Sequence, residues 1–364
     1  MFKAIERWGR LYLTKLFAFF LRSTQKDLTL GVSPKILIIR LDQRVGNLIM
    51  LTPMLHSLKS HFGECHITLL AQPAAEKLLG DHPCIDELMC FRKNELFGSS
   101  GPLQTLLTMR RNRFDLVIDG GNPTDPSTTQ SLLTRFSGGK HTLGFAHGPF
   151  AGLYSFPHPL NPDLEHEIDM RLDLLNALPN IKLERQTSLT FAPQEKINPQ
   201  LSDLLEQMKA TKYIVINCGA RLSEKSLSVE NYAEIARLGM AKGFTPLLTY
   251  GPTEIGLAKN IKAANEGCNL APETNLIELA MLMQQASAVV ACDTGPMHIA
   301  VAVGTPTLGI FMTTSPQRYG YNEGCNTTVD LASLDTAQAF EAIKEWLASC
   351  SNEEPSSYSK TSPR

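Results

Sequence analysis

Short apolar runs alternate with amphipathic segments along most of the chain, and the two kinds of segment differ in length and period. The apolar runs have the length of strands, whereas the segments between them repeat apolar residues every three or four positions, as helices do. The strand-like runs lie at residues 36–39, 66–70, 87–90 and 116–118, and again at 213–217, 245–249, 288–291 and 307–311. The helical patterns lie at residues 48–62, 102–113, 229–242, 253–264 and 277–284. This alternation predicts an α/β protein with two doubly wound, Rossmann-like domains that face each other across a cleft.

The same pattern predicts where the domains begin and end. The polar, proline-containing stretch 186–199 is the expected linker, because it has neither period. We therefore expect one Rossmann-like domain at residues 31–190 and a second at 200–335, followed by a final helix at 336–350. Residues 351–364, rich in serine, proline and charge, are expected to be a disordered tail.

The first 30 residues predict an amphipathic helix at the N-terminus. Apolar residues recur there at helical spacing, and six Lys or Arg residues against two acidic ones leave a net charge of +4. The segment is too short and too charged to span a bilayer, and it lacks the cleavage site of a signal peptide. A basic, aromatic-rich helix of this kind suits the surface of an anionic membrane. The alternative is a helix that packs on the protein's own body.

Overall composition narrows the class of protein. The chain has 364 residues, a formal net charge of −2 and 19% charged residues, which gives no reason to expect nucleic acid as a partner. Its eight cysteines form no Cys-x-x-Cys pair and no zinc-like spacing with histidine. A reduced, cytoplasmic compartment and no metal are the expectations that follow. A nicotinamide enzyme is disfavoured, because no Gly-x-Gly-x-x-Gly follows the first strand.

The most informative stretch is Ala-Cys-Asp-Thr-Gly-Pro-Met-His at residues 291–298. It lies between an apolar run and a helix of small residues, so it predicts a strand, a tight loop and a helix N-terminus. Such an N-terminus favours a phosphate. Asp293 or Thr294 could cap the helix, Gly295 would let a ligand approach the backbone, and His298 lies one turn in. An ordinary capped helix with a packed histidine is the alternative interpretation.

Asp-Thr-Gly-x-x-His before a Gly-x-Pro turn resembles the donor-site motif of glycosyltransferase family nine, the lipopolysaccharide heptosyltransferases. Further stretches resemble this family in the expected order, and together they cover about residues 34–347. These stretches are Lys35 to Pro53, Phe114 to Asp119, Gly144-Phe145 and Ala220 to Lys225. The resemblance implies a GT-B fold with an acceptor-binding first domain and a nucleotide-sugar-binding second domain. It also implies that the last helix crosses back over the first domain.

For the donor side, the resemblance implies an ADP-sugar substrate, with no cofactor and no metal. Lys225 and the backbone at Thr294 and Gly295 would then hold the diphosphate, and Asp293 and His298 would touch sugar or phosphate oxygens. Three further positions have weaker signals: Glu254 near the ribose, Ala220 or Arg221 near phosphate, and Thr274 or Asn275 near the base. The family's Trp-Pro two residues beyond the lysine is Leu227-Ser228 in this chain.

The acceptor side departs from the family. Family members carry Gly-Asp before the helix that ends in Thr-Pro, and that aspartate is the general base. Here the pair is Gly46-Asn47, and an amide cannot take up a proton at neutral pH. Asp42 in the same loop and Asp119 at the end of a strand are the alternative bases, while Arg44 and Gly46 are expected to contact the acceptor.

Taken together, the sequence predicts an inverting glycosyltransferase that moves a heptose, or a related sugar, from an ADP-activated donor. The acceptor would be a lipid-linked glycan such as the lipopolysaccharide core, met at the inner face of the inner membrane. Two alternatives stay open. One is a catalytically silent relative that only binds a nucleotide sugar or glycan, and the other is a nucleotide-sugar epimerase of the same fold.

Overall fold

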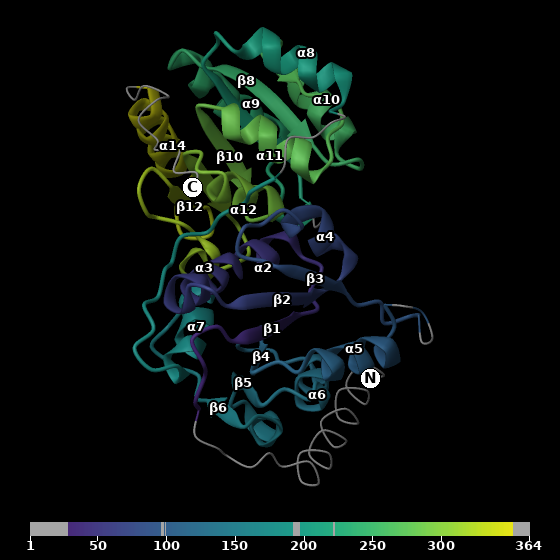
Figure 1. Cartoon of the computed structure of the whole chain (residues 1–364). Helices are drawn as coiled ribbons and strands as arrows, with labels where there is room; N and C mark the ends of the chain where they lie inside the picture. The colour runs from purple at the N-terminus through teal and green to yellow at the C-terminus, as the bar shows by residue number, and fades with distance from the viewer. Residues whose placement is uncertain (1–27, 96–97, 99, 192–196, 221–222, 352–364) are drawn as a thin grey trace, which may run out of the picture. The chain divides into compact units, whose positions relative to one another are not determined.

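A computed structural model describes residues 28–95, 98, 100–191, 197–220 and 223–351. The chain divides into two compact units, residues 1–190 and 191–364. Each unit is built around one six-stranded sheet, and every strand pairing recorded in the two sheets is parallel (Figure 1). The predicted N-terminal helix, apart from residues 28–30, and the tail beyond residue 351 lie outside the described residues.

The first sheet has the strand order β3-β2-β1-β4-β5-β6. The chain adds β2 and β3 outward from β1 and then returns to place β4 on the other side of β1, so the winding direction reverses between β1 and β4. The elements are β1 (Lys35–Arg40), α2 (Val45–Ile49), α3 (Thr52–Phe62), β2 (His66–Ala71), α4 (Pro73–Leu79), β3 (Glu87–Cys90), α5 (Pro102–Asn112), β4 (Leu116–Asp119), α6 (Thr128–Phe136), β5 (His141–Phe145), η1 (Gly148–Leu153), β6 (Phe156–His158), α7 (Glu167–Asp173) and η2 (Leu174–Ala177).

Helices on both faces explain why the central strands are continuously apolar. From Ile36 to Arg40, every side chain of β1 is buried. Leu37 and Ile39 belong to a core cluster that includes Met109 of α5 and Leu133 of α6, so these two helices cover one face of the sheet. Strands buried on both faces lose the alternation of polar and apolar residues, which is why they read as apolar runs.

The prediction of one continuous helix at residues 48–62 is wrong. The pattern at residues 48–62 reads as a single helix, but the structure has two, α2 and α3, joined at Met50 and Leu51. Pro53 is the physical reason, because its ring would clash with the carbonyl of Ile49 and it has no N–H to donate. That carbonyl instead accepts a hydrogen bond from Thr52 Oγ1 at 2.8 Å.

The second sheet repeats the topology of the first, with the order β12-β11-β10-β7-β8-β9. The reversal of winding falls between β7 and β10. The elements are α8 (Pro199–Met208), β7 (Tyr213–Cys218), η3 (Ser223–Lys225), α9 (Val229–Ala241), β8 (Thr245–Tyr250), α10 (Ile255–Ala264), β9 (Asn269–Leu270), α11 (Leu276–Gln285), β10 (Ala288–Cys292), α12 (Gly295–Ala302), β11 (Thr307–Phe311), α13 (Pro316–Tyr319), β12 (Thr327–Asp330) and α14 (Thr336–Ser351).

The last helix, α14, is packed into the core of the second unit. Ile343, Trp346 and Leu347 join the buried cluster around β7 and β10, and α14 contacts α9 and β12. The Trp346 indole N–H donates to the Cys325 carbonyl at 2.9 Å. No helix of the described ranges is long and apolar enough to cross a membrane.

The segment that leads toward the second unit is held on α3 by buried polar groups. Ser188 N donates to Thr52 Oγ1 at 3.0 Å. Ser188 Oγ lies 2.5 Å from His56 Nε2 and 3.0 Å from His82 Nε2. His82 is buried, and its Nδ1 accepts the Cys84 N–H at 3.2 Å. Burial, and then the neighbouring His56, lower the pKa of His82 from 6.5 to about 4.

We expect this histidine to make the fold sensitive to acid. Between pH 6.5 and pH 4 the unfolded chain binds a proton at position 82 that the folded chain does not, so stability falls as the pH falls. Urea denaturation followed by circular dichroism at pH 7 and pH 5 should show a loss of about 2 kcal/mol that His82→Gln removes. His147→Gln, at an exposed histidine, is the control and should keep the loss. An identical pH dependence in His82→Gln would contradict the assignment.

Candidate active site

A partly buried ion pair in the second unit lies where the winding reverses. Lys225 ends η3 in the loop that follows β7, and Asp293 directly follows β10, the neighbour of β7 in the sheet. Lys225 Nζ lies 2.7 Å from Asp293 Oδ2 and 3.4 Å from the Asp293 carbonyl oxygen. The lysine side chain is 21% exposed and the aspartate side chain 9%. The two predicted donor residues therefore meet at the carboxyl edge of the sheet, where α/β proteins bind ligands.

Thr314, which the sequence did not indicate, holds Asp293 from the other side, and Tyr321, also not indicated, holds the predicted His298. Thr314 Oγ1, beyond the end of β11, donates to Asp293 Oδ2 at 2.5 Å. His298 is buried in α12 with its Nδ1 2.8 Å from Tyr321 Oη, and its Nε2 lies 3.9 Å from Asp293 Oδ1. The rule that strand ends meet at one edge could have indicated Thr314, because β11 neighbours β10. Tyr321 had no such signal.

The start of α12 differs from the prediction in how it is capped. Thr294 is the N-cap residue, but neither its hydroxyl nor Asp293 caps the helix. The Thr294 hydroxyl donates back to the Cys292 carbonyl at 3.1 Å, and the Asp293 carboxylate is engaged by Lys225 and Thr314. Gly295 is the first helical residue, with Pro296 next to it. The polar side chains at this terminus thus make their contacts elsewhere in the site, and the N-cap side chain does not cap the first backbone N–H groups of α12.

Other predicted donor residues fall into different surroundings. Glu254 lies over Gly219 and Gly251 at the ends of β7 and β8, because a Cβ built at either glycine would come within 2.4 Å of its side chain. Asn275 is the N-cap of α11, where it forms a capping box with Glu278. Thr274 and Ala220 are half-buried. Arg221 lies outside the described residues.

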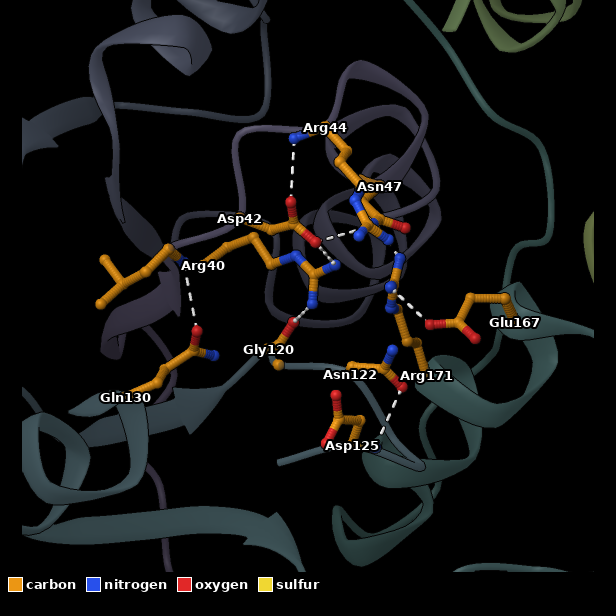
Figure 2. A network of polar contacts seen from close by, with 12 residues as sticks. Arg40, Asp42, Arg44, Asn47, Gly120, Asn122, Asp125, Gln130, Glu167 and Arg171 are labelled. Atoms are coloured by element: carbon orange, nitrogen blue, oxygen red, sulfur yellow. Dashed lines mark hydrogen bonds and ion pairs between the residues drawn. The ribbon is translucent and has the colours of Figure 1, made fainter. Parts of the chain in front are cut away.

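In the first unit, a polar network is centred on Asp42, just beyond the end of β1 (Figure 2). Its Oδ1 accepts the backbone N–H of Arg44 at 2.9 Å. Its Oδ2 accepts a hydrogen bond from Asn47 Nδ2 at 2.5 Å and lies 3.4 Å from a guanidinium nitrogen of Arg40. The Asp42 side chain is still 29% exposed. The loop therefore holds a carboxylate in a fixed orientation with part of it open to solvent.

Two buried arginines support this network. Arg40 donates to the Gly120 carbonyl at 2.9 Å, which ties the end of β1 to the end of β4 across the reversal of winding. Arg171 of α7 donates to the Asn47 carbonyl at 3.2 Å and pairs with Glu167 at 2.7 Å. Burial and the nearby Arg171 charge lower the pKa of Arg40 to about 9, so it keeps its proton at neutral pH. Neither arginine was indicated by the sequence as a site residue.

Asp119, the other candidate base, is enclosed. Its Oδ1 accepts hydrogen bonds from Gln130 Nε2 at 2.6 Å and from the Gly121 N–H at 3.0 Å. Its Oδ2 accepts from Tyr154 at 2.6 Å and Ser131 at 3.0 Å. Burial raises the pKa of this carboxyl, against the opposite effect of its four donors. These contacts favour a structural role for Asp119 over proton transfer to an acceptor.

Gly144, quoted above for its family resemblance, serves the same network. A Cβ at this position would lie 2.4 Å from the Tyr154 ring, whose hydroxyl reaches Asp119. Of the predicted acceptor residues, Gly46 is buried in α2, whereas Arg44 is exposed at the N-cap of that helix. No carboxylate of the described chain pairs with the Arg44 guanidinium.

These two sites, one in each unit, can be compared with known proteins. Residues 104–345 match the model of glycosyltransferase family 9 (heptosyltransferase). The chain belongs to this family. No group of three or more His, Cys, Asp or Glu residues in the described ranges is placed to hold a metal ion.

The named relatives are distant in sequence. The chain is 24% identical to lipopolysaccharide heptosyltransferase 3 of Escherichia coli, over 73% of this chain and 80% of the relative. It is 25% identical to lipopolysaccharide heptosyltransferase 1 of Campylobacter coli, over 81% of this chain and 89% of the relative.

Solved family 9 structures share the fold. A family 9 glycosyltransferase from Veillonella parvula is 20% identical, with a TM-score of 0.71, covering 88% of this chain and 92% of that chain. The E. coli heptosyltransferase WaaC, solved with ADP, is 18% identical, with a TM-score of 0.64, covering 87% of this chain and 99% of that chain. The predicted GT-B fold class, with two parallel six-stranded α/β sheets, is confirmed.

The buried pair Arg171–Glu167 gives a stability prediction with an internal control. Both side chains are 1% exposed, so Arg171→Ala leaves a buried carboxylate without its partner and should lower the free energy of unfolding by about 3–5 kcal/mol. Arg185→Ala breaks an ion pair with Asp169 whose side chains are 31% and 33% exposed, and should cost less than about 1 kcal/mol. Denaturant unfolding measures both. Equal losses of unfolding free energy in the two variants would contradict the view that burial makes the Arg171–Glu167 pair more important for stability.

Proposed function

We propose that this family 9 member is an inverting glycosyltransferase that moves a heptose, or a related sugar, from an ADP-activated donor to a lipid-linked glycan such as the lipopolysaccharide core. The observation that carries the proposal is the Lys225–Asp293 pair at the carboxyl edge of the second sheet, at positions that match the family's donor motif. Relatives named as lipopolysaccharide heptosyltransferases support the choice of substrate class.

The proposed donor site uses a fixed cation. A lysine is a compact charge whose three donors can turn toward a diphosphate oxygen. Asp293 and Thr314 keep Lys225 and its loop in place before the donor arrives, so little ordering is needed when the diphosphate binds. Developing negative charge on the leaving ADP would be stabilised by Lys225 and by the helix start at Gly295, in keeping with a reaction that needs no metal.

The proposed base is Asp42. Glycosyl transfer requires that the acceptor hydroxyl lose its proton, and the carboxylate is held by the Arg44 N–H and the Asn47 amide while part of it is open to solvent. The buried Arg40 guanidinium lies 3.4 Å from Asp42 Oδ2 and helps to hold the carboxylate in position. We assign Asn47 and Arg171 to positioning, and Arg44 to an anionic group of the acceptor.

The acceptor is proposed to be met at the inner face of the inner membrane. The net charge of +4 and the aromatic, amphipathic pattern of residues 1–30 support attachment of this segment to anionic lipid. The protein would then work as a peripheral cytoplasmic enzyme.

A second candidate is a catalytically silent relative, and Asn47 is the observation that favours it. Such a protein would bind a nucleotide sugar without transferring the sugar. A silent relative would bind the donor but would not turn it over, so measurement of both binding and turnover distinguishes the two candidates.

We expect Lys225→Ala to weaken donor binding. Loss of one charge-assisted contact to the diphosphate corresponds to about 1.5–3 kcal/mol, or roughly 10- to 150-fold in the dissociation constant of ADP or an ADP-heptose. Isothermal titration calorimetry measures this, with Lys259→Ala, at an exposed position of α10, as the control that should bind as the wild type does. Unchanged binding by Lys225→Ala would remove the donor site from this position.

Asp42→Asn separates the two candidates. For a transferase, we expect donor turnover to fall by about 10²- to 10⁴-fold while the donor dissociation constant stays within about twofold. Asp163→Asn, at an exposed aspartate of the same unit, is the matched control and should keep full turnover. Donor binding without turnover in the wild type, with turnover restored by Asn47→Asp, would favour the silent relative instead.

A further inference from the structure

Helix α5 presents two leucines to solvent, one turn apart. Leu103 is 54% exposed and Leu107 is 41% exposed. In the described part of the chain, only Val32 and Leu334 join them as large hydrophobic side chains with comparable exposure. Single exposed leucines are ordinary, but two on adjacent turns of one helix form a continuous apolar strip.

The orientation of α5 is fixed, so the helix cannot roll to bury this strip. Thr105 and Met109 on its opposite face are buried, and Met109 belongs to the core cluster under the first sheet. Leu106 packs against the same cluster. The exposed leucines therefore point away from the core because the other face is already committed to it.

The strip continues into a basic turn. Arg110 and Arg111 follow on the same helix face, Arg113 comes directly after the helix, and α5 contains no acidic residue. No carboxylate of the described ranges pairs with any of these three arginines, and Arg110 Nε donates to a neutral group, the Phe136 carbonyl, at 3.0 Å. Exposed Lys140 lies nearby, since its N–H donates to the Phe114 carbonyl. The surface thus combines apolar area with concentrated positive charge.

We propose that this face of α5, defined as Leu103, Leu107, Arg110 and Arg111, docks on an anionic lipid surface. Leucines that enter the headgroup region beside arginines that meet lipid phosphates are the two contributions that hold an interfacial helix. Charge selects this occupant. Residues 1–30 of the same chain carry a net charge of +4, and a second copy of this face would be equally basic, so both would be repelled.

Chain continuity adds to the argument. The Asp115 N–H, two residues beyond Arg113, donates to the Lys35 carbonyl at the start of β1. Residues 28–34 therefore enter the first sheet at the edge where the basic turn of α5 ends, and Val32 in this stretch is 86% exposed. The predicted amphipathic segment and α5 can reach one bilayer together, which gives two contacts with a shared effective concentration. This inference concerns attachment and does not depend on the proposed glycosyl transfer.

The test is binding of the full chain to vesicles of phosphatidylcholine alone and to vesicles that also contain phosphatidylglycerol. The variant Leu107→Gln/Arg111→Gln should lose at least about tenfold in partitioning onto the anionic vesicles. The matched control is Leu334→Gln/Lys259→Gln, which removes a similarly exposed leucine and an exposed cation from the second unit. It should stay within about twofold of the wild type. Thermal unfolding checks that both variants are folded.

Further variants test whether attachment uses α5, residues 1–30 or both. Arg10→Gln/Lys15→Gln/Arg22→Gln in the full chain should weaken binding further when it is combined with the α5 variant. If the α5 variant binds anionic vesicles as the wild type does, or if the control variant loses binding equally, docking by α5 is overturned. Calorimetry with ADP should give the same affinity for the α5 variant and the wild type. If the protein shows no transferase activity but still needs α5 for vesicle binding, the proposed glycosyl transfer is refuted and docking by α5 stands.

Discussion

The constraint on which both sites depend is the reversal of winding in each sheet. Between β1 and β4, and again between β7 and β10, neighbouring strands lead to loops that turn in opposite directions, and α/β proteins bind ligands at such points. The structure bridges each point with a cation. Arg40 links the end of β1 to the Gly120 carbonyl, and Lys225 links the β7 loop to Asp293. The same topology, used twice, thus gives one unit a carboxylate with a buried guanidinium beneath it and the other a lysine beside an aspartate.

Of the three carboxylates near Arg40, which are Glu167, Asp119 and Asp42, only Asp42 stays partly exposed. Glu167 is buried against Arg171, and Asp119 is enclosed by four donors. Asp42 has equally fixed partners but remains partly exposed. Buried charges are tolerated because each one has a partner, and removal of one partner leaves the other desolvated. A loop held in this way needs little reorganisation, which is what a group that accepts a proton during reaction requires.

The sequence predicted features that depend on residues close together in the chain, and it missed features that depend on contacts between distant segments. Apolar runs predicted β1 and β7 because both faces of these strands are buried. By contrast, β5 was not predicted, since His141, Thr142 and Gly144 break the run, although all three are buried. Lys225 and Asp293 came from a motif and do meet. The sequence placed Asp119 and Asp42 side by side as candidate bases, because a strand end does not reveal which carboxyl is enclosed. That difference comes from Tyr154 and Gln130, which reach Asp119 from other elements.

The replacement of the family aspartate by Asn47 is consistent with a base that has moved to Asp42. The Asn47 amide donates to Asp42 Oδ2 at 2.5 Å, a contact that a second carboxylate could make only if one of the two were protonated. Two carboxyl groups that share a proton would titrate as a pair, and neither would be a simple base near neutral pH. An amide at position 47 avoids this, because it orients Asp42 and leaves that residue as the single carboxylate in the loop. The expected effect of reversing the substitution therefore differs between the two candidates: if Asp42 is the base, Asn47→Asp should lower donor turnover, because the second carboxyl group would share a proton with Asp42.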